Sequence, residues 1–204
     1  MSMSKKKSIE RWLNELNNFS FKEYDNLPDL DLYMEQVMIY LEKQLYIFQT
    51  SINDKQITPS MINNYVKGDV VPAPKSKKYS KEHLAIIEEI CTLKKVLSLD
   101  EIKQIITTTY SNTEDKSKVF NNFNMINTSK TQDIVSDAFK ALNDVDENDD
   151  EALTNIALEF AVISNCYINI AKKILYLIKA YNYNEEIKNK NNDNNEESND
   201  DSNE

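Results

Sequence analysis

The chain has 204 residues, of which 40% are hydrophobic and 28% are charged, enough for one generous domain or two small ones with a real core. One glycine and four prolines exclude a protein built from many tight hairpins and favour helices. The net charge of −10 argues against a nucleic-acid partner unless the positive charges are gathered in one place, because phosphate binding needs a positive face.

Residues that could carry catalysis are scarce. Cys91 and Cys166 lie in apolar helical patterns without a Cys-x-x-Cys pair or a secretory leader, which predicts free thiols in a reducing cytoplasm. His83 is the only histidine and cannot by itself build a histidine metal site or a histidine-based catalytic pair. We therefore expect no enzymatic activity, no metal and no cofactor.

The first elements in chain order are two amphipathic helices. Residues 1–26 contain IERWLNEL, whose apolar residues share a helical face that we expect to pack on the body, after a basic start interpreted as a frayed terminus. From Leu30 to Phe48, apolar residues recur at three- and four-residue steps and predict a longer helix, with a preceding aspartate as its possible cap.

A short helix is predicted from Pro59 to about Lys67. Thr58 precedes it as a candidate N-cap, and proline at the first helical position costs no hydrogen bond. Gly68, the single glycine, follows at the place where a left-handed residue often ends a helix. These signals predict a helix of about two turns that ends abruptly.

A basic loop separates this short helix from two more. The segment 72–74 is Pro-Ala-Pro, a rigid extended stretch that leads into three lysines, and residues 55–82 together carry six lysines against two carboxylates. Ser80 is a candidate N-cap for the next helix, and Ser98 with Glu101 has the spacing of a capping box that begins another.

Between Ile57 and Ile106 the sequence resembles the DNA-binding domain of MerR-type regulators and of small bacterial proteins that share its pattern. The family runs from a short recognition helix through a proline exit and a basic wing to a helix ending in Ser-Leu-Glu-Glu-Ile-Lys. The matching segments here are Thr58-Pro59, Asn64-Tyr65, Val70-Val71-Pro72, Tyr79-Ser80 and Ser98-Leu99-Asp100-Glu101-Ile102-Lys103.

The resemblance implies a recognition helix in the major groove and a wing on the DNA backbone. By position, Ser60, Met61 and Asn63 would face the groove, Asn63 or Asn64 could read adenine, and Tyr65 would give its hydroxyl to a phosphate. The asparagines could equally be solvated polar residues, the two tyrosines packing wedges, and the lysines a solvated loop. The DNA-contacting residues implied are Thr58, Ser60, Met61, Asn63, Asn64, Tyr65, Lys67, Lys75, Lys77, Lys78 and Tyr79.

The sequence departs from the family in four respects. Asn63 stands where the family has arginine before its tyrosine pair, the glycine comes one place early, and the wing lacks the usual Gly-Tyr-Arg turn. The family's short first helix is also missing, so the helix from Leu30 to Phe48 would have to replace it.

The second half predicts dimerising or regulatory helices. Two short amphipathic helices are expected at 117–125 and 131–142, followed by an acidic linker and a long apolar helix from Glu151 to Tyr181. That helix is either a central core helix or a dimer seam, and the charges within it, such as Glu159 and Lys172, argue against membrane insertion. Residues 184–204 lack the apolar residues to fold and predict a disordered acidic tail.

The expected fold class is all-α, a MerR-like winged helix-turn-helix domain followed by a helical bundle with a long C-terminal helix. The expected divisions are an N-terminal segment 1–26, the DNA-binding domain 27–110, a dimerisation or regulatory region 111–183 and the tail 184–204. We expect a cytoplasmic, sequence-specific transcriptional regulator that binds double-stranded DNA as a homodimer, with an effector ligand left open. The alternatives are a helical protein-interaction adaptor without DNA binding and an excisionase-like recombination factor.

Overall fold

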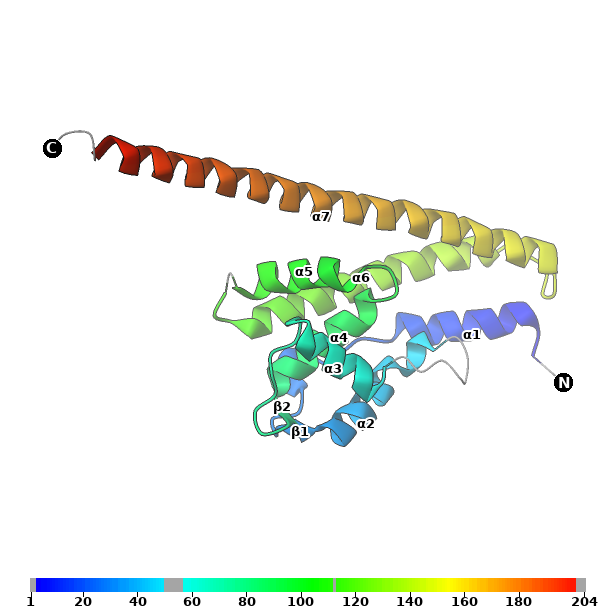
Figure 1. Ribbon diagram of the computed structural model, residues 1–204. Coiled ribbons are helices and arrows are strands. Elements are labelled where there is room, and N and C mark those ends of the chain that lie inside the picture. Colours follow the sequence, from blue (N-terminus) through cyan, green and yellow to red (C-terminus); the bar gives the residue numbers. More distant parts are fainter. Residues whose placement is uncertain (1–2, 50–56, 112, 201–204) are drawn as a thin grey trace. The chain divides into compact units, whose positions relative to one another are not determined.

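A computed structural model describes residues 3–49, 57–111 and 113–200, with side chains as far as Glu185. This part of the chain is mostly helical, as its composition predicts, and divides after Ala161 into two compact units. Figure 1 shows the order of the elements. They are α1 (Lys5–Asn17), η1 (Tyr24–Asn26), β1 (Leu32–Tyr33), α2 (Met34–Leu45), η2 (Tyr46–Phe48), α3 (Pro59–Lys67), β2 (Lys78–Tyr79), α4 (Lys81–Leu93), α5 (Leu99–Ser111), α6 (Lys116–Leu142) and α7 (Asp150–Asp200).

The first unit is built around α4, a helix that is buried nearly all round. Its residues 83–91 are all buried, and α2, α5 and α6 supply most of the surrounding core. Phe120 of α6 is fully buried and belongs to one cluster with Ala85 of α4 and Leu27. An amphipathic helix can leave its polar face in water, but a helix with apolar residues on every face has to be covered on every side. The surrounding helices provide that cover for α4.

Two short strands join parts of the chain that are far apart in sequence. β1 pairs antiparallel with β2, with Leu32 opposite Tyr79 and Tyr33 opposite Lys78. The predicted helix start at Leu30 is therefore wrong: α2 begins at Met34, and the Gln36 side chain accepts a hydrogen bond from the Tyr33 backbone N–H at 2.9 Å instead of an aspartate capping the helix. The spacing of apolar residues could not reveal a strand pair only two residues long.

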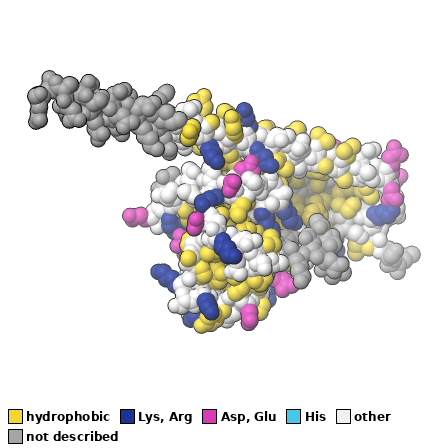
Figure 2. All heavy atoms as spheres, in the orientation of Figure 1, with side chains coloured by type: hydrophobic (Ala, Val, Ile, Leu, Met, Phe, Trp, Pro, Cys, Tyr) yellow, Lys and Arg dark blue, Asp and Glu magenta, His cyan; other side chains and the backbone are white. Residues whose placement is uncertain are grey.

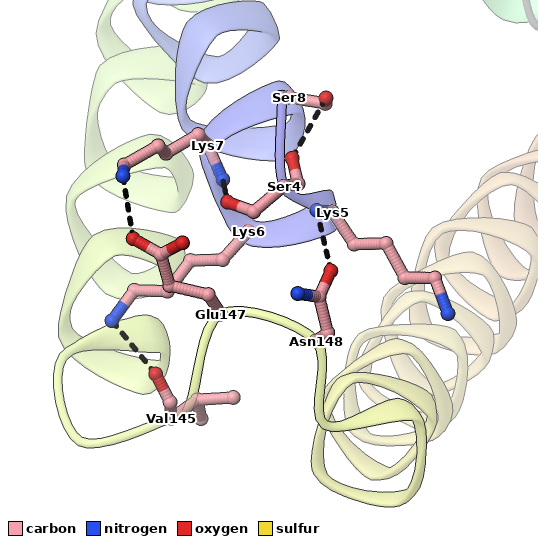
Figure 3. A network of polar contacts seen from close by, with 8 residues as sticks. All are labelled: Ser4, Lys5, Lys6, Lys7, Ser8, Val145, Glu147 and Asn148. Carbon is pink, nitrogen blue, oxygen red and sulfur yellow. Dashed lines mark hydrogen bonds and ion pairs between the residues drawn. The ribbon is translucent and has the colours of Figure 1, made fainter. Parts of the chain in front are cut away.

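Helix α1 packs on the C-terminal part of α6, which confirms the expected contact with the body. Leu13 is buried with Val135, Ala138 and Leu142, and apolar residues from the start of α7 complete this cluster. Within the described residues the basic start is not frayed, because Ser4 caps α1 through the Lys7 backbone N–H, while residues 1–2 of that prediction lie outside the described part. The lysines at this start hold the acidic linker, as Figure 3 shows: the Lys6 ammonium donates to the Val145 carbonyl at 2.9 Å, and the Lys7 ammonium lies 2.6 Å from the Glu147 carboxylate.

The predicted pair of helices at 117–125 and 131–142 is a single helix, α6. The polar residues between them contain neither glycine nor proline, and a helix already begun gains a hydrogen bond with each added residue without a second nucleation cost. Near the middle, the buried Asn124 amide donates to the Lys22 carbonyl at 2.9 Å, which ties α6 to the segment before α2.

The long predicted helix is present and extends further than its apolar pattern. α7 begins at Asp150 and remains helical to Asp200, so its backbone is regular over most of the acidic run for which composition predicts disorder. By length and composition alone, the part from Asp150 to Glu185 is also the one helix of the described chain that could cross a membrane, a test that core helices of soluble proteins pass as well.

Candidate nucleic-acid interface

Helix α3 forms as its end signals predict. The Thr58 side chain accepts a hydrogen bond from the Met61 backbone N–H at 3.3 Å, and Pro59 occupies the first turn. Ile62 and Tyr65 face the core and are buried, which fixes how the helix is rotated about its axis. The opposite face is therefore turned to solvent, with exposed side chains at Ser60, Asn63, Asn64 and Lys67 and a half-buried one at Met61.

The end of α3 differs from the prediction in one detail. Gly68 has φ −83°, and the left-handed residue is Asp69, with φ 54°. The turn brings the backbone N–H groups of Val70 and Val71 to the Tyr65 carbonyl, at 2.9 and 3.2 Å. Lys103 of α5 also donates to the Gly68 carbonyl at 2.8 Å, so the exit of α3 is held by its neighbours and not by a glycine conformation.

The basic loop contains a tight two-residue turn. The Lys78 backbone N–H donates to the Lys75 carbonyl at 2.9 Å, and the two residues between them, Ser76 and Lys77, both have positive φ, at 51° and 63°. Two consecutive positive φ values are typical of a type I′ hairpin turn, which matches the twist of the flanking strands. The loop is thus a small wing, although it lacks the glycine that such turns favour.

The wing is anchored to the rest of the first unit through β1. The Lys78 ammonium lies 5.1 Å from the centre of the Tyr33 ring, a cation–π contact that also covers the strand pair. Sequence reasoning missed Tyr33, because only the pairing of β1 with β2 brings it to the wing.

The lysines of this region fall into two groups. Lys81 forms an ion pair with Asp29, and Lys103 lies 3.9 Å from Asp69, so acids already partner both of them. The remaining group, Lys67, Lys75 and Lys77, is exposed and makes no ion pair with any residue that the structure describes. On the face shown in Figure 2, lysines are scattered between hydrophobic and uncharged side chains, so any phosphate contact would be made by a few local lysines.

The two tyrosines of the resemblance lie in the core. Tyr65 is 6% exposed and Tyr79 3%, and burial raises the pKa of the Tyr65 hydroxyl to about 12. Buried side chains of this kind act as packing residues, and the two tyrosines expose little surface with which to contact a phosphate. The tyrosines instead fix α3 and β2 against α4: the Tyr79 ring meets His83 edge to face, with the ring centres 5.6 Å apart.

The two helices that follow the wing begin where their caps predict. The Ser80 backbone N–H donates to His83 Nδ1 at 3.0 Å at the start of α4. At the start of α5, Glu101 accepts from the Ser98 backbone N–H at 2.7 Å, and the Glu101 N–H donates to the Ser98 hydroxyl at 3.3 Å, which confirms the capping box.

The described residues also outline a hollow behind the wing. It has a volume of about 330 Å³ and lies between the exit of α3 and the adjoining faces of α4 and α5, with Val70, Pro72, Ile86 and Ile106 in its wall. Its polar groups do not converge on one point: the Lys116 ammonium in its wall donates to the Tyr110 and Thr113 carbonyls. Among all the residues that the structure describes, no group of three or more His, Cys, Asp or Glu could hold a metal ion.

Comparison with known families identifies the central part of the chain. Residues 22–129, just over half of its length, match the family described as Domain of unknown function (DUF1836). The matched region runs from the segment before η1 into α6 and therefore contains α3, the wing and all of α4 and α5. No curated protein and no solved structure matches the chain. The chain belongs to the DUF1836 family.

Proposed function

We propose that this chain is a cytoplasmic, sequence-specific transcriptional regulator that binds double-stranded DNA as a dimer through a MerR-like winged helix-turn-helix. In this proposal α3 enters the major groove and the turn from Lys75 to Lys78 contacts the backbone. The observation that supports it is the arrangement of α3: a capped helix with a buried rear face and a polar exposed face, followed closely by a tight turn with unpaired lysines.

The exposed side chains divide by the contact each can make. Lys67, Lys75 and Lys77 would neutralise phosphates, which gives affinity without sequence preference. Asn63 or Asn64 would read adenine through its amide, and Ser60 could bond to several bases. Met61 would offer an apolar contact to a thymine methyl group. The Thr58 hydroxyl is already occupied as a cap, so we assign it a positioning role.

The packing assigns supporting roles to the remaining residues of the resemblance. Tyr65 and Tyr79 hold α3 and β2 in place from the core, and Lys78 stays over the Tyr33 ring while its neighbours face solvent. A rigid platform of this kind reduces the entropy lost when DNA binds. In this proposal the residues that would touch DNA are distinct from those that would only orient them.

The test is selection of bound fragments from sheared genomic DNA by the purified protein, beside the variant Lys75→Glu/Lys77→Glu. We expect a shared motif for the wild type and an affinity at least about a hundredfold lower for the variant, since each reversed lysine loses a phosphate contact and adds a repulsion. The control Lys172→Glu/Lys179→Glu makes the same change of charge on exposed positions of α7 and should bind normally.

Base reading is tested separately with Asn63→Ala. This variant should keep its salt dependence and lose preference at one position of the motif, because amide readout contributes discrimination and not charge. If the wild type selects no sequence, or if the wing variant and its control bind equally well, DNA recognition by α3 and the wing is wrong.

The exposed apolar side chains of α7 support a second candidate, an adaptor that uses the same fold to bind another protein. Leu158, Tyr167 and Ile170 are each more than half exposed, which is unusual for large apolar side chains without a partner. Salt separates the two candidates: DNA binding through lysines weakens steeply as salt rises, whereas apolar association does not.

A further inference from the structure

A second hollow of the first unit lies where α1, η2 and the C-terminal end of α4 meet, and we call it the α1–α4 hollow. Its volume of about 470 Å³ is within the range of roughly 300–1,000 Å³ that is usual for small-molecule sites. It shares no lining residue with the hollow behind the wing. The described residues that line it are Trp12, Ile47, Phe48, Gln49, Cys91, Thr92 and Lys95.

The aromatic part of its wall is held in a fixed orientation. The Trp12 indole N–H donates to the Ile47 carbonyl at 3.4 Å, although the Trp12 side chain is 44% exposed. The Phe48 ring meets the Phe19 ring edge to face, with the ring centres 5.2 Å apart, and its centre lies 6.1 Å from that of the buried Phe21 ring. Two aromatic surfaces are thus in place before a ligand arrives, which lowers the entropy lost on binding.

The inner part of the wall offers few free polar groups. The Thr92 hydroxyl donates to the Glu88 carbonyl at 3.0 Å. Cys91 is buried, and burial raises the pKa of its thiol to about 12, so the thiol is uncharged at neutral pH. A water molecule in a cavity needs about two to four polar partners, which this wall does not supply. The α1–α4 hollow therefore favours an apolar, aromatic ligand body over water.

Lys95 gives the hollow one charged group among the described residues that line it. The Lys95 ammonium donates to the Phe48 carbonyl at 3.1 Å, and the residue is exposed, which places the charge at the mouth of the hollow. A lysine ammonium carries three N–H donors, so this contact leaves two of them for a ligand. A carboxylate is the acceptor that suits such a group, since hydrogen bonds between two ionised groups are stronger than neutral ones.

We propose that the α1–α4 hollow binds a flat aromatic carboxylate. The aromatic rings of the ligand pack against Trp12 and Phe48, and its carboxylate accepts hydrogen bonds from the Lys95 ammonium. The site uses no residue of α3 or of the wing, and it joins α1, which precedes the matched family region, to α4 within that region. The inference therefore goes beyond the proposed function and does not require that the protein bind DNA.

The first test is calorimetric titration of the full-length protein with cinnamate and with cinnamamide, an uncharged analogue of similar shape. We expect a dissociation constant of about 100 µM for cinnamate, and about fivefold weaker binding of the amide because the exposed ion pair contributes only modestly. Lys95→Met should bind cinnamate and cinnamamide equally well, and should bind the amide as the wild type does. Lys95 is exposed, so its replacement leaves the core of the first unit intact.

The second test locates the ligand. Trp12 is the only tryptophan of the chain, so its indole N–H gives one signal in a proton–nitrogen correlation NMR spectrum, and a bound aromatic ring should shift that signal. Thr92→Phe fills the α1–α4 hollow and should abolish binding of both compounds. Thr107→Phe makes the same change in the hollow behind the wing and is the control, which should bind cinnamate normally. Circular dichroism shows whether each variant is folded, and the Trp12 signal and Lys95→Met report on the site without Thr92→Phe.

The outcomes separate this inference from the proposed function. A wild type that binds neither compound, an unshifted Trp12 signal, or a folded Thr92→Phe variant that binds cinnamate normally would overturn the site. Equal affinities of the wild type for cinnamate and cinnamamide would overturn the assignment of a carboxylate to Lys95. Loss of binding in Thr107→Phe alone would move the ligand to the hollow behind the wing and overturn the inference. A protein that binds cinnamate but selects no DNA would leave the inference intact and refute the proposed function.

Discussion

Replacing Glu88 with glutamine tests how the first unit responds to pH. Glu88 lies in the middle of α4 with no exposed surface, and both of its carboxylate oxygens lack a hydrogen-bond partner among the described residues. Burial raises the pKa of Glu88 from its ordinary 4.5 to about 7, although the nearby Tyr40 hydroxyl opposes this rise. The folded protein therefore keeps a proton on Glu88 over a range in which the unfolded chain has lost it.

The sign of the pH effect follows from this difference. At a pH below about 4.5, Glu88 is protonated in both states and imposes no cost. As the pH rises toward about 7 the unfolded state is increasingly favoured, and above that the penalty stays constant at about 3 kcal/mol, which is the difference of the two pKa values multiplied by 1.36 kcal/mol. A neutral glutamine of similar shape removes this contribution.

The measurement is urea unfolding followed by circular dichroism at several pH values between about pH 5 and about pH 8. The wild type should lose stability across this range, and Glu88→Gln should lose about 2.5 kcal/mol less, because part of the penalty is already present at about pH 5. Glu42→Gln makes the same change on the exposed face of α2 and serves as the control. Equal pH slopes for Glu88→Gln and the wild type would refute a protonated, buried Glu88.

Two further predictions concern local structure near the candidate interface. Ser98→Ala removes the hydroxyl that accepts the Glu101 N–H, so unfolding should show a loss of about 1 kcal/mol, and an unchanged stability would mean that the capping box contributes nothing. Ser76→Gly relieves a positive φ, so thermal unfolding should occur about 2 °C higher. A lower melting temperature would show that the left-handed conformation at this position carries no strain.

Local signals allowed much of the helical structure to be predicted. Thr58, Ser80 and Ser98 each cap a helix through residues only three positions away, so the boundaries of α3, α4 and α5 could be recognised without knowledge of the fold. No glycine or proline lies between residues 116 and 142, so α6 continues as one helix where two were predicted. The gathering of lysines in the wing region was also apparent from the sequence.

Contacts between distant residues could not be predicted in this way. The pairing of Leu32 with Tyr79 determines where α2 begins and how the wing is anchored, yet neither strand is long enough to produce an alternating pattern. The burial of Tyr65 is a similar case, because a tyrosine has one polar end and fits either a core or a surface. The choice depends on what packs against it.

The sequence by itself determined the helical class, the caps, the position of the basic wing and the apolar repeat of α7, because each depends on residues within a few turns of one another. Only the tertiary structure decided which side chains reach solvent. It buries Tyr65 and Tyr79, pairs Lys81 and Lys103 with acids, and leaves Lys67, Lys75 and Lys77 exposed. Burial and ion pairing depend on segments that are distant in sequence and are brought together by folding, so a local sequence pattern cannot predict them.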